Sequence, residues 1–378
     1  MPSQDFSRSL SQGGQSSFGR SKALFARIHL DLPLLLLLLC LACVGLFVLY
    51  SGSGRDPDML SRQLIHFAIG FTALFVTAQI PPRFYSIATP WVYLASLLGL
   101  IGVLLFGVGA KGAQRWLALP GLPRFQPAEI MKIALPLMMA WYMSTQPLPP
   151  RLKSILVSIL IIVVPTLLIL KQPDLGTALL VASVGFFVIF FSGMSWRLII
   201  SMITLVSALA PIMWFYVMHD YQKQRVLTFL NPESDPLGSG WNIIQSKIAI
   251  GSGGIQGKGW LLGTQSHLEF LPESHTDFII AVLAEELGFV GVLLLLTLYA
   301  LIIMRCLYLA NLGKTLFSRL VAGSLAMMFF IYIFVNMGMV SGILPVVGVP
   351  LPLISYGGTS VISLLTAFGI LMSMSTHK

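Results

Sequence analysis

Glu129 and Lys132 lie three residues apart at the start of an apolar run. Side chains at positions i and i+3 share one face of a helix, so the two could form a local ion pair with the lysine snorkelling toward the membrane surface. The stretch before them adds Lys111, Arg115 and Arg124. With Lys132 these make four basic groups, more than one glutamate can neutralise, and this surplus indicates a site that binds an anion.

A second group of charged residues consists of acids in or just before another apolar run. Asp277 precedes this run, and Glu285 and Glu286 follow eight and nine residues later, about 12 Å deeper on a helix that rises ~1.5 Å per residue. Acids are costly in a bilayer, so we expect this pair to face a polar cavity or a partner group. Spacing alone leaves their role open between lining a substrate path and pairing within the bundle. Spacing alone also favours helix capping for Asp277 and ordinary loop charge for Glu273.

Three further stretches near apolar runs bear on the site. Asp174, in KQPDLG, precedes a run and is expected to cap a helix, because an acid is favourable at a helix N-terminus. His275, in a loop beside a helix start, is expected to be structural. The SYGGTS stretch at residues 355–360 is expected to shape a cavity without a catalytic role.

Glycines gather in the long connection between two apolar runs, at positions 251, 253, 254, 257 and 259. A phosphate-binding P-loop requires glycine where Ser252 stands and serine or threonine where Gly259 stands, so this class of site is excluded. Two interpretations remain open. The glycines could let a bulky lipid or its diphosphate approach the backbone, or they could simply form turns.

The elements that must position these residues are membrane-spanning helices. Of the 378 residues, 56% are hydrophobic and 10% are charged, and the mean hydropathy is +0.87, whereas a soluble protein carries about a quarter charged residues. Long apolar runs favour helices over a β-barrel, and scattered basic residues argue against nucleic-acid binding. We predict an all-α polytopic membrane protein with about ten transmembrane helices, from runs at 32–51, 63–80, 89–108, 127–145, 154–170, 175–194, 197–218, 277–304, 320–341 and 359–374.

The predicted domain organisation is a disordered cytoplasmic tail at residues 1–28 and a single transmembrane domain at 29–378. A long, partly ordered extracytoplasmic loop, residues 219–276, joins helices 7 and 8 of this domain. With both termini cytoplasmic, twelve basic residues lie inside and eleven outside; leaving out six in the long loop or at helix ends gives twelve against five, which favours this orientation. Twelve of the fourteen acids then lie on the outer face, where we expect the chemistry.

The three cysteines, Cys40, Cys43 and Cys306, lie in apolar segments. A metal or redox site requires more ligands nearby, so we expect them to be small buried hydrophobic residues. No zinc-type ligand cluster occurs in the sequence, and any Mg²⁺ is expected to be shared with substrate phosphates.

Five long motifs together resemble the SEDS family of polytopic proteins, which includes RodA, FtsW and SpoVE. They are PAEIMK, KQPDLGTAL, WNIIQSKIAIGSGG, LPESHTDFIIAVLAEELG and GILPVVGVPLPLISYGGTS. The resemblance extends from about residue 30 to the C-terminus, and KQPDLGT and LPVVGVPLP are more similar to the RodA branch than to FtsW.

The resemblance implies a peptidoglycan glycosyltransferase of cell elongation that polymerises lipid II on the outer face of the bacterial inner membrane. It also implies a class B penicillin-binding protein as partner, with other elongation-complex proteins. The essential acid of the family's TDF motif matches Asp277, and its important Arg, Glu and Lys match Arg124, Glu129 and Lys132. Because an α-linked diphosphate becomes a β-1,4 bond, one displacement suffices, with Asp277 as general base.

The departing diphosphate also requires cations that stabilise its charge. Arg124 and Lys132 are candidates, with Glu129 orienting Lys132 or helping to hold a divalent metal, and Arg115 and Lys258 are weaker candidates. The rival interpretations are a lipid II flippase, a scaffold that only recruits the penicillin-binding protein, and a division-type (FtsW-like) polymerase. A flippase requires polar groups throughout the bilayer depth, whereas most acids here cluster at one face.

Overall fold

The computed structural model describes residues 28–110, 113–117, 125–218, 220–231, 233, 240–267 and 273–377. The predicted disordered tail at 1–28 falls almost wholly outside the described residues. Lys111 and Arg124 also lie outside them.

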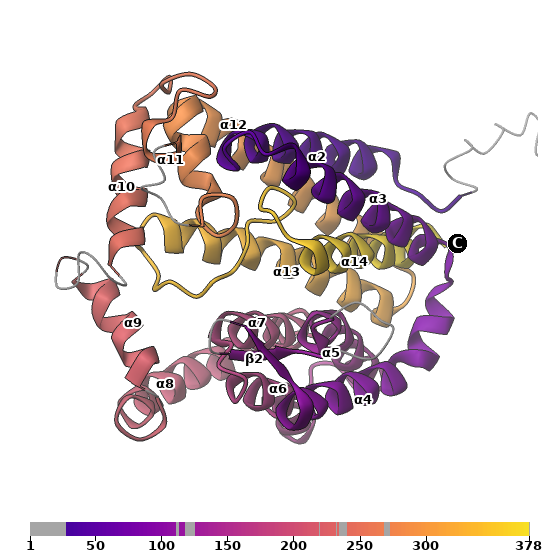
Figure 1. Cartoon of the computed structure of the whole chain (residues 1–378). Coiled ribbons are helices and arrows are strands. Elements are labelled where there is room, and N and C mark those ends of the chain that lie inside the picture. The colour runs from indigo at the N-terminus through magenta and orange to yellow at the C-terminus, as the bar shows by residue number, and fades with distance from the viewer. Residues whose placement is uncertain are drawn as a thin grey trace, which may run out of the picture.

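Each of the ten predicted apolar runs corresponds to a helix (Figure 1). Seven of these helices are long and apolar enough to cross a membrane, and they include the 34-residue α12. The other three are α5, α7 and α8, and α8 continues into a π-helical turn, η1 (Met213–Val217). The prediction of an all-α polytopic membrane protein is therefore confirmed. The ten helices are α2 (Leu32–Gly52), α3 (Pro57–Gln79), α4 (Pro82–Phe106), α5 (Pro127–Ser144), α6 (Leu152–Leu170), α7 (Leu175–Phe191), α8 (Trp196–Ile212), α12 (Ile279–Leu312), α13 (Leu316–Val340) and α14 (Gly358–Thr376).

A short hairpin that the sequence did not predict follows α4. Its strands, β1 (Val108–Ala110) and β2 (Ala113–Trp116), pair antiparallel. The next residue, Leu117, pairs with Phe125 through backbone hydrogen bonds of 3.0 and 3.2 Å. This pairing returns the chain to the start of α5 and places β2 above it.

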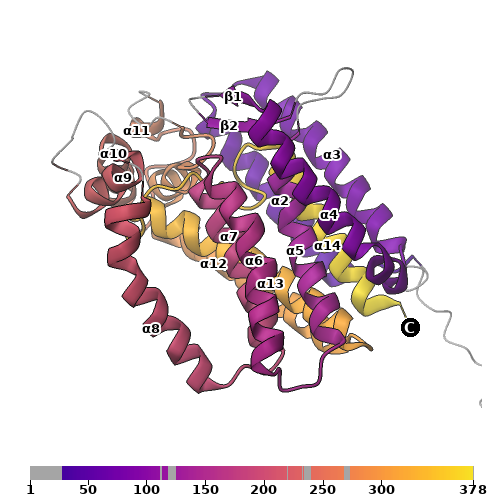
Figure 2. The same ribbon diagram turned by 90° about the horizontal axis from the view of Figure 1, so that it is seen from below.

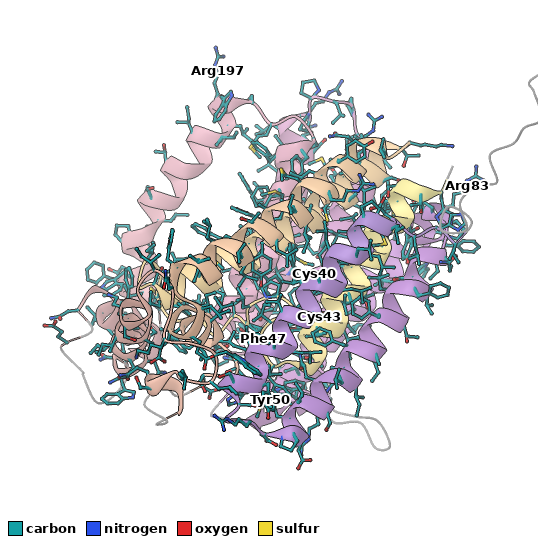
Figure 3. All side chains as sticks on the ribbon, turned by 90° about the horizontal axis from the view of Figure 1, so that it is seen from above. Cys40, Cys43, Phe47, Tyr50, Arg83 and Arg197 are labelled. Atoms are coloured by element: carbon teal, nitrogen blue, oxygen red, sulfur yellow. The ribbon has the colours of Figure 1, made fainter. Side chains whose placement is uncertain are left out.

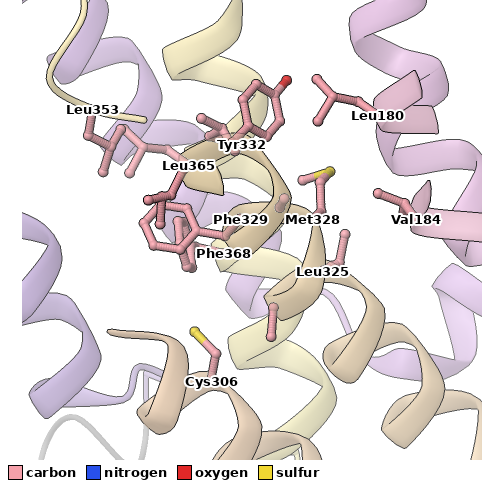
Figure 4. Packing of buried hydrophobic residues seen from close by; sticks show 14 of the residues in the cluster. Leu180, Val184, Cys306, Leu325, Met328, Phe329, Tyr332, Leu353, Leu365 and Phe368 are labelled. Atoms are coloured by element: carbon pink, nitrogen blue, oxygen red, sulfur yellow. The ribbon is translucent and has the colours of Figure 1, made fainter. Parts of the chain in front are cut away.

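Helix α13 is the centre of the packing. Its side chains are buried against α7, α12 and α14, and Figure 4 shows Phe329 beside Phe368 of α14 and Met328 facing Leu180 of α7. Cys306 of α12 is buried in the same core, as predicted. Cys40 and Cys43 are exposed on α2 instead (Figure 3), so the expectation that they are buried was wrong. Apolar side chains are found both where a helix faces lipid and where it faces the protein core. The sequence of an apolar run therefore does not show which of its residues are buried in the protein.

The two ends of the described chain meet at one end of the bundle. The rings of His29 and His377 stack with centroids 3.8 Å apart, and Arg305 binds Asp31 through a 2.7 Å ion pair. The β-hairpin, α9 (Asp220–Leu230), α10 (Trp241–Gly253) and α11 (Thr264–His267) gather at the other end (Figure 2). Residues 29 and 377 therefore lie on one side, as an even number of crossings requires.

Helix α12 is interrupted at Gly288, where φ is 66° and ψ is −163°. The segment after α10 binds the interrupted backbone through four hydrogen bonds of 2.9–3.1 Å: Phe289 N to Gly254 O, Val290 N to Ile255 O, Lys258 N to Glu285 O and Gly259 N to Glu286 O. Backbone groups freed inside a membrane must be paired by protein, and this segment pairs them.

The glycines of this segment are explained by the same approach of two backbones. A Cβ at Gly253 or Gly257 would overlap backbone atoms of α12, and Gly257 has a φ of 80°. Of the two interpretations left open by the sequence, close packing and turn formation account for these two glycines without a ligand.

Candidate active site

A polar cavity of about 170 Å³ lies at the hairpin end of the bundle. Its walls come from β2, α5, α7, α13, the loop before α14 and the first turn of α14. The described polar residues that line it are Arg115, Gln126, Glu129, Lys132, Asp174, Thr177, Tyr332, Thr359 and Ser360. The two last residues belong to SYGGTS, so the expectation that this stretch shapes a cavity is confirmed.

Lys132 is turned into the bundle and is only 3% exposed. Its Nζ lies 2.7 Å from Glu129 Oε1 and donates a hydrogen bond to the Tyr332 hydroxyl. Glu129 Oε2 accepts a 2.7 Å hydrogen bond from Ser363 Oγ of α14. The ion pair predicted from i, i+3 spacing is present, but the lysine does not snorkel to the surface. A buried pair of this kind requires such additional hydrogen bonds, because desolvation of both charges is costly.

Local sequence explains why the pair sits at the end of a helix. Helix α5 has Gln126 in the N-cap position and Pro127 in its first turn, and Glu129 lies in that turn as well. An acid there interacts favourably with the helix dipole, and the lysine one turn later then faces inward beside it.

Arg115 and Asp174 form the other charged wall of the cavity. Arg115 Nη2 donates to Pro173 O at 2.6 Å, and Arg115 Nε lies 3.8 Å from Asp174 Oδ2. Asp174 caps α7 by accepting from Thr177 N at 3.1 Å, which confirms the predicted capping role. Gln126 Nε2 also donates to Asp174, at 3.2 Å, and so ties α5 to α7.

Among the described residues that line the cavity, positive and negative charges are equal in number, because Arg115 and Lys132 pair with Asp174 and Glu129. The predicted surplus of cations therefore depends on Lys111 and Arg124, which lie outside the described residues. Where this surplus falls stays a prediction.

Asp277 is half-buried and borders the polar cavity. A Cβ built on Gly348, which lines the cavity, would lie 3.5 Å from Asp277 Oδ2. The backbone oxygen of Asp277 accepts a 2.9 Å hydrogen bond from Asn336 Nδ2. Helix α12 begins at Ile279 with Phe278 in the N-cap position, so Asp277 stands one residue before the capping position. The structure thus brings Asp277, Glu129, Lys132 and Arg115 to one site.

Lys258 does not line this cavity. Its Nζ lies 2.7 Å from Glu285 Oε1 and 2.8 Å from Thr264 Oγ1. Glu285 Oε1 also accepts hydrogen bonds from the backbone N–H groups of Thr264 and Gln265, at 2.8 and 3.0 Å. Of the two roles left open for Glu285, pairing within the protein is the one observed.

The remaining candidate residues have local partners. Glu286 accepts a hydrogen bond from Ser51 Oγ of α2, and Glu273 accepts one from Thr276 Oγ1 at 2.8 Å. The backbone oxygen of His275 accepts from Tyr356 N at 2.8 Å, and the two rings lie edge to face, which fits the expected structural role of His275.

An apolar groove of about 410 Å³ adjoins the polar cavity. It runs along α5 and α14 and is lined by Ile130, Ile133 and Leu137 of α5 together with residues of α3, α4 and α14. Gln126, Glu129 and Thr359 line both spaces. The site can therefore hold a molecule with a polar, charged part joined to a long apolar part.

Within the described part of the chain, no three His, Cys, Asp or Glu side chains gather into a metal-binding group. The two acids of the cavity, Glu129 and Asp174, are engaged by Lys132 and Ser363, and by Arg115, Gln126 and Thr177. Their donor set fits ion pairing better than a resident metal ion.

Sequence reasoning missed Tyr332, Asn336 and Ser363. They lie in apolar helices without a recognisable motif, and only the packing of α13 and α14 against α5 brings them to the site. The available signal was the presence of polar side chains in otherwise apolar runs.

The fold and the site define a polytopic membrane protein with a charged cavity that opens into an apolar groove. A family model of cell cycle proteins, named for FtsW, RodA and SpoVE, matches residues 31–378, and the chain belongs to this family.

Two relatives illustrate the breadth of the family. The chain is 56% identical over 357 residues to the peptidoglycan glycosyltransferase MrdB of Escherichia coli K12, covering 94% of this chain and 96% of that protein. It is 38% identical over 365 residues to the probable peptidoglycan glycosyltransferase FtsW of Geobacter metallireducens, covering 92% of this chain and 95% of that one.

Solved structures agree with this assignment. A chain from a peptidoglycan synthase complex that coordinates polymerization and crosslinking is 34% identical, with a TM-score of 0.79 over 90% of this chain and 96% of that one. The rod shape determining protein RodA of Thermus thermophilus is 31% identical, with a TM-score of 0.68 over 90% of this chain and 95% of that one.

Proposed function

We propose that this chain is a peptidoglycan glycosyltransferase that polymerises lipid II into β-1,4-linked glycan strands during cell elongation and rod-shape maintenance. Lipid II is a disaccharide-pentapeptide carried on undecaprenyl diphosphate. The observation that carries the proposal is the polar cavity that shares Gln126, Glu129 and Thr359 with the apolar groove. A sugar diphosphate on a long lipid has the same two-part character. The identity of 56% to a protein named peptidoglycan glycosyltransferase supports the same reaction class.

The proposed reaction is a single inverting displacement with Asp277 as general base. The carboxylate takes the proton from the acceptor 4-hydroxyl while that oxygen attacks the anomeric carbon of the donor sugar. The bond from this carbon to the diphosphate oxygen breaks, and the lipid diphosphate leaves with the electron pair. The place of Asp277 at the cavity wall supports this role, because a general base must come within hydrogen-bond reach of the proton that it takes.

The cations of the site are proposed to stabilise the leaving diphosphate. Lys132 and Arg115 face the cavity, and Glu129 holds Lys132 in place through their 2.7 Å contact. Arg124 is proposed as a further cation at the same site. Fixed charges in a water-poor cavity stabilise developing negative charge without reorganising, which can lower the barrier by several kcal/mol. Lys258, bound to Glu285, is the weakest candidate for a substrate contact.

We further propose that the protein lies in the bacterial inner membrane with both termini cytoplasmic and the cavity on the outer face. The proposed partners are a class B penicillin-binding protein, which crosslinks the new strands, and other elongation-complex proteins. A relationship to a peptidoglycan synthase complex supports the first partner. The higher identity to MrdB than to the FtsW relative favours an elongation role over a division role.

The test is polymerisation by purified components. The protein is reconstituted in liposomes with its penicillin-binding partner, whose transpeptidase is disabled, and labelled lipid II is supplied. We expect glycan polymer that a muramidase digests to disaccharide units. Absence of polymer from the wild-type pair would contradict the proposal.

The same liposomes test the flippase alternative. A flippase equilibrates lipid II between leaflets and makes no polymer, whereas a polymerase makes polymer from outer-leaflet lipid II without accelerating its transfer between leaflets. Lipid transfer without polymer would therefore favour the alternative.

A further inference from the structure

Asn336 is an amide side chain buried near the C-terminal end of a membrane-spanning helix. It lies on α13 and is 0% exposed, and its Oδ1 is buried without a hydrogen-bond partner in the described part of the structure. A polar group in this position is costly, and the cost is larger when one of its atoms is unpaired. Packing alone does not account for an asparagine here, because a leucine of the same branched shape would fill the space without an unpaired oxygen but would remove the donor of two backbone oxygens.

The other end of the amide holds two segments that have no regular secondary structure. Asn336 Nδ2 donates to Asp277 O at 2.9 Å and to Val349 O at 2.7 Å. The first acceptor belongs to the turn that precedes α12, and the second belongs to the loop between α13 and α14. One side chain therefore links the residue proposed as general base to a residue that lines the polar cavity.

The link fixes the carboxylate against the cavity wall. Gly348 is the neighbour of Val349 in the chain, and a Cβ at Gly348 would lie 3.5 Å from Asp277 Oδ2. The Asp277 carboxylate therefore lies beside this part of the cavity wall. Elsewhere the turn and the loop are joined by Ser355 Oγ to Thr276 O at 2.6 Å and by Tyr356 N to His275 O at 2.8 Å. If the link between Asp277 and Val349 is lost, the segments stay joined there, but the backbone of Asp277 is released from the cavity wall.

The same helix face also holds the cationic side of the site. Tyr332 lies one turn before Asn336, and its hydroxyl accepts a hydrogen bond from Lys132. Residues four apart share a helix face at a rise of about 6 Å. Helix α13 thus sets the separation of the proposed base from the proposed diphosphate-binding cation.

We infer that Asn336 is a positioning residue for glycosyl transfer, which holds the backbone of Asp277 at the wall of the cavity; this inference rests on the proposed function. Asn336 does not contact the substrate. It acts through Asp277, because a base displaced by about 1 Å from its reacting proton can lose about 100-fold in rate.

The test replaces the amide by a side chain of the same branched shape that cannot donate, Asn336→Leu. The control is Ser324→Ala, which removes another fully buried polar group of α13, a hydroxyl that donates to Val321 O at 2.9 Å. Polymerisation rates are measured against lipid II concentration with the penicillin-binding partner present. Amide hydrogen exchange is measured on the same samples.

We expect Asn336→Leu to lower kcat about 10- to 100-fold while KM for lipid II changes less than about twofold, because the cations that bind the diphosphate are untouched. Hydrogen exchange should accelerate in residues 273–278 and 343–350 and stay unchanged in α2 to α7. Ser324→Ala should alter neither measurement. If the leucine variant does not fold, Asn336→Ala, which adds no bulk, is measured in the same way.

Two outcomes overturn the inference. One is a kcat within about twofold of wild type together with unchanged exchange in both segments. The other is a loss of kcat that is accompanied by faster exchange throughout the bundle, which would make Asn336 a structural residue only. Because hydrogen exchange requires no turnover, it still decides whether Asn336 holds the two segments if the wild type makes no polymer, so the two failures are distinguishable.

Discussion

Lys132 illustrates how this protein keeps a charge inside an apolar bundle. Glu129 supplies the counter-charge, and the Tyr332 hydroxyl accepts a further hydrogen bond from the ammonium group. Glu129 is in turn held by Ser363. Four residues from three helices thus form one hydrogen-bonded network, in which each polar side chain has a hydrogen-bond partner in the network.

We predict that Lys132→Met abolishes detectable polymerisation and lowers the free energy of unfolding by about 3–5 kcal/mol, because it leaves the Glu129 charge buried without its cation. Thermal unfolding in detergent and the polymerisation assay measure the two effects. The control is Lys153→Met, which removes an exposed lysine at the start of α6. A Lys132→Met protein with wild-type activity would contradict the role of this cation.

Lys258 is expected to behave differently, because its partner Glu285 lies away from the polar cavity. We predict that Lys258→Met leaves KM for lipid II unchanged and lowers the free energy of unfolding by about 1.5–3 kcal/mol, the range for hydrogen bonds to a charged group. Titrating lipid II in the polymerisation assay, together with a thermal melt, separates the two properties. A several-fold rise in KM with unchanged stability would instead make Lys258 a substrate contact.

At the scale of elements, the interruption of α12 is joined to the segment that follows α10. Four backbone hydrogen bonds and the Lys258–Glu285 ion pair connect them. Because the first part of α12 follows directly from Asp277, this connection supports the helix that leads from the proposed base. The close approach is possible only where residues 253, 257 and 288 have no side chain.

Two glycines, Gly257 of this segment and Gly251 of α10, provide a matched test of this contact. Gly257→Ala places a Cβ against backbone of α12 at a φ of 80°, whereas Gly251 of α10 has open space around it. We predict that Gly257→Ala destabilises the protein by more than about 1 kcal/mol and that Gly251→Ala is neutral or stabilises it by up to about 1 kcal/mol. Thermal unfolding of the two variants measures the difference. Equal melting temperatures would show that the segment does not pack on α12 in this way.

The extent of sequence-based prediction differed between helices and contacts. All ten apolar runs became helices, since apolar length is a local property, and the cap at Asp174 followed from a local rule. The interruption at Gly288 and the contacts of Tyr332 and Asn336 depend on which helices meet. Polar side chains in apolar runs indicate that such residues have partners, but one sequence does not indicate which partners. The cation surplus was read from residues that include Arg124, which lies outside the described chain.

At the scale of the whole molecule, the chemistry and the chain ends are at opposite ends of the bundle. The stacked pair His29 and His377 marks one end, and the polar cavity lies at the other, beside the hairpin. Arg83 and Arg197 are two of the twelve basic residues that the predicted orientation places inside, and they lie at the end of the bundle opposite Tyr50 (Figure 3). The predicted outer-face active site and the predicted cytoplasmic termini therefore stand or fall together, because one orientation of the bundle gives both.

This prediction is tested by thiol labelling in intact cells. In a background with Cys40, Cys43 and Cys306 replaced by alanine, single cysteines are introduced at two exposed positions, Gln256→Cys and Lys314→Cys. We expect a membrane-impermeant maleimide to label position 256 in intact cells and position 314 only after lysis. The reverse pattern would place the cavity on the cytoplasmic face and contradict the proposed orientation.

The central claim is that Asp277 is the general base, and one rate comparison tests it most directly. Asp277→Asn keeps the size of the side chain and removes its basicity, and Glu273→Gln makes the same change in charge four residues earlier. A positioned base contributes about 10²- to 10⁴-fold. We therefore predict that polymerisation of lipid II by Asp277→Asn falls by at least about 100-fold, while Glu273→Gln stays within a few-fold of wild type. Polymerisation by Asp277→Asn at a rate close to that of Glu273→Gln would contradict the account.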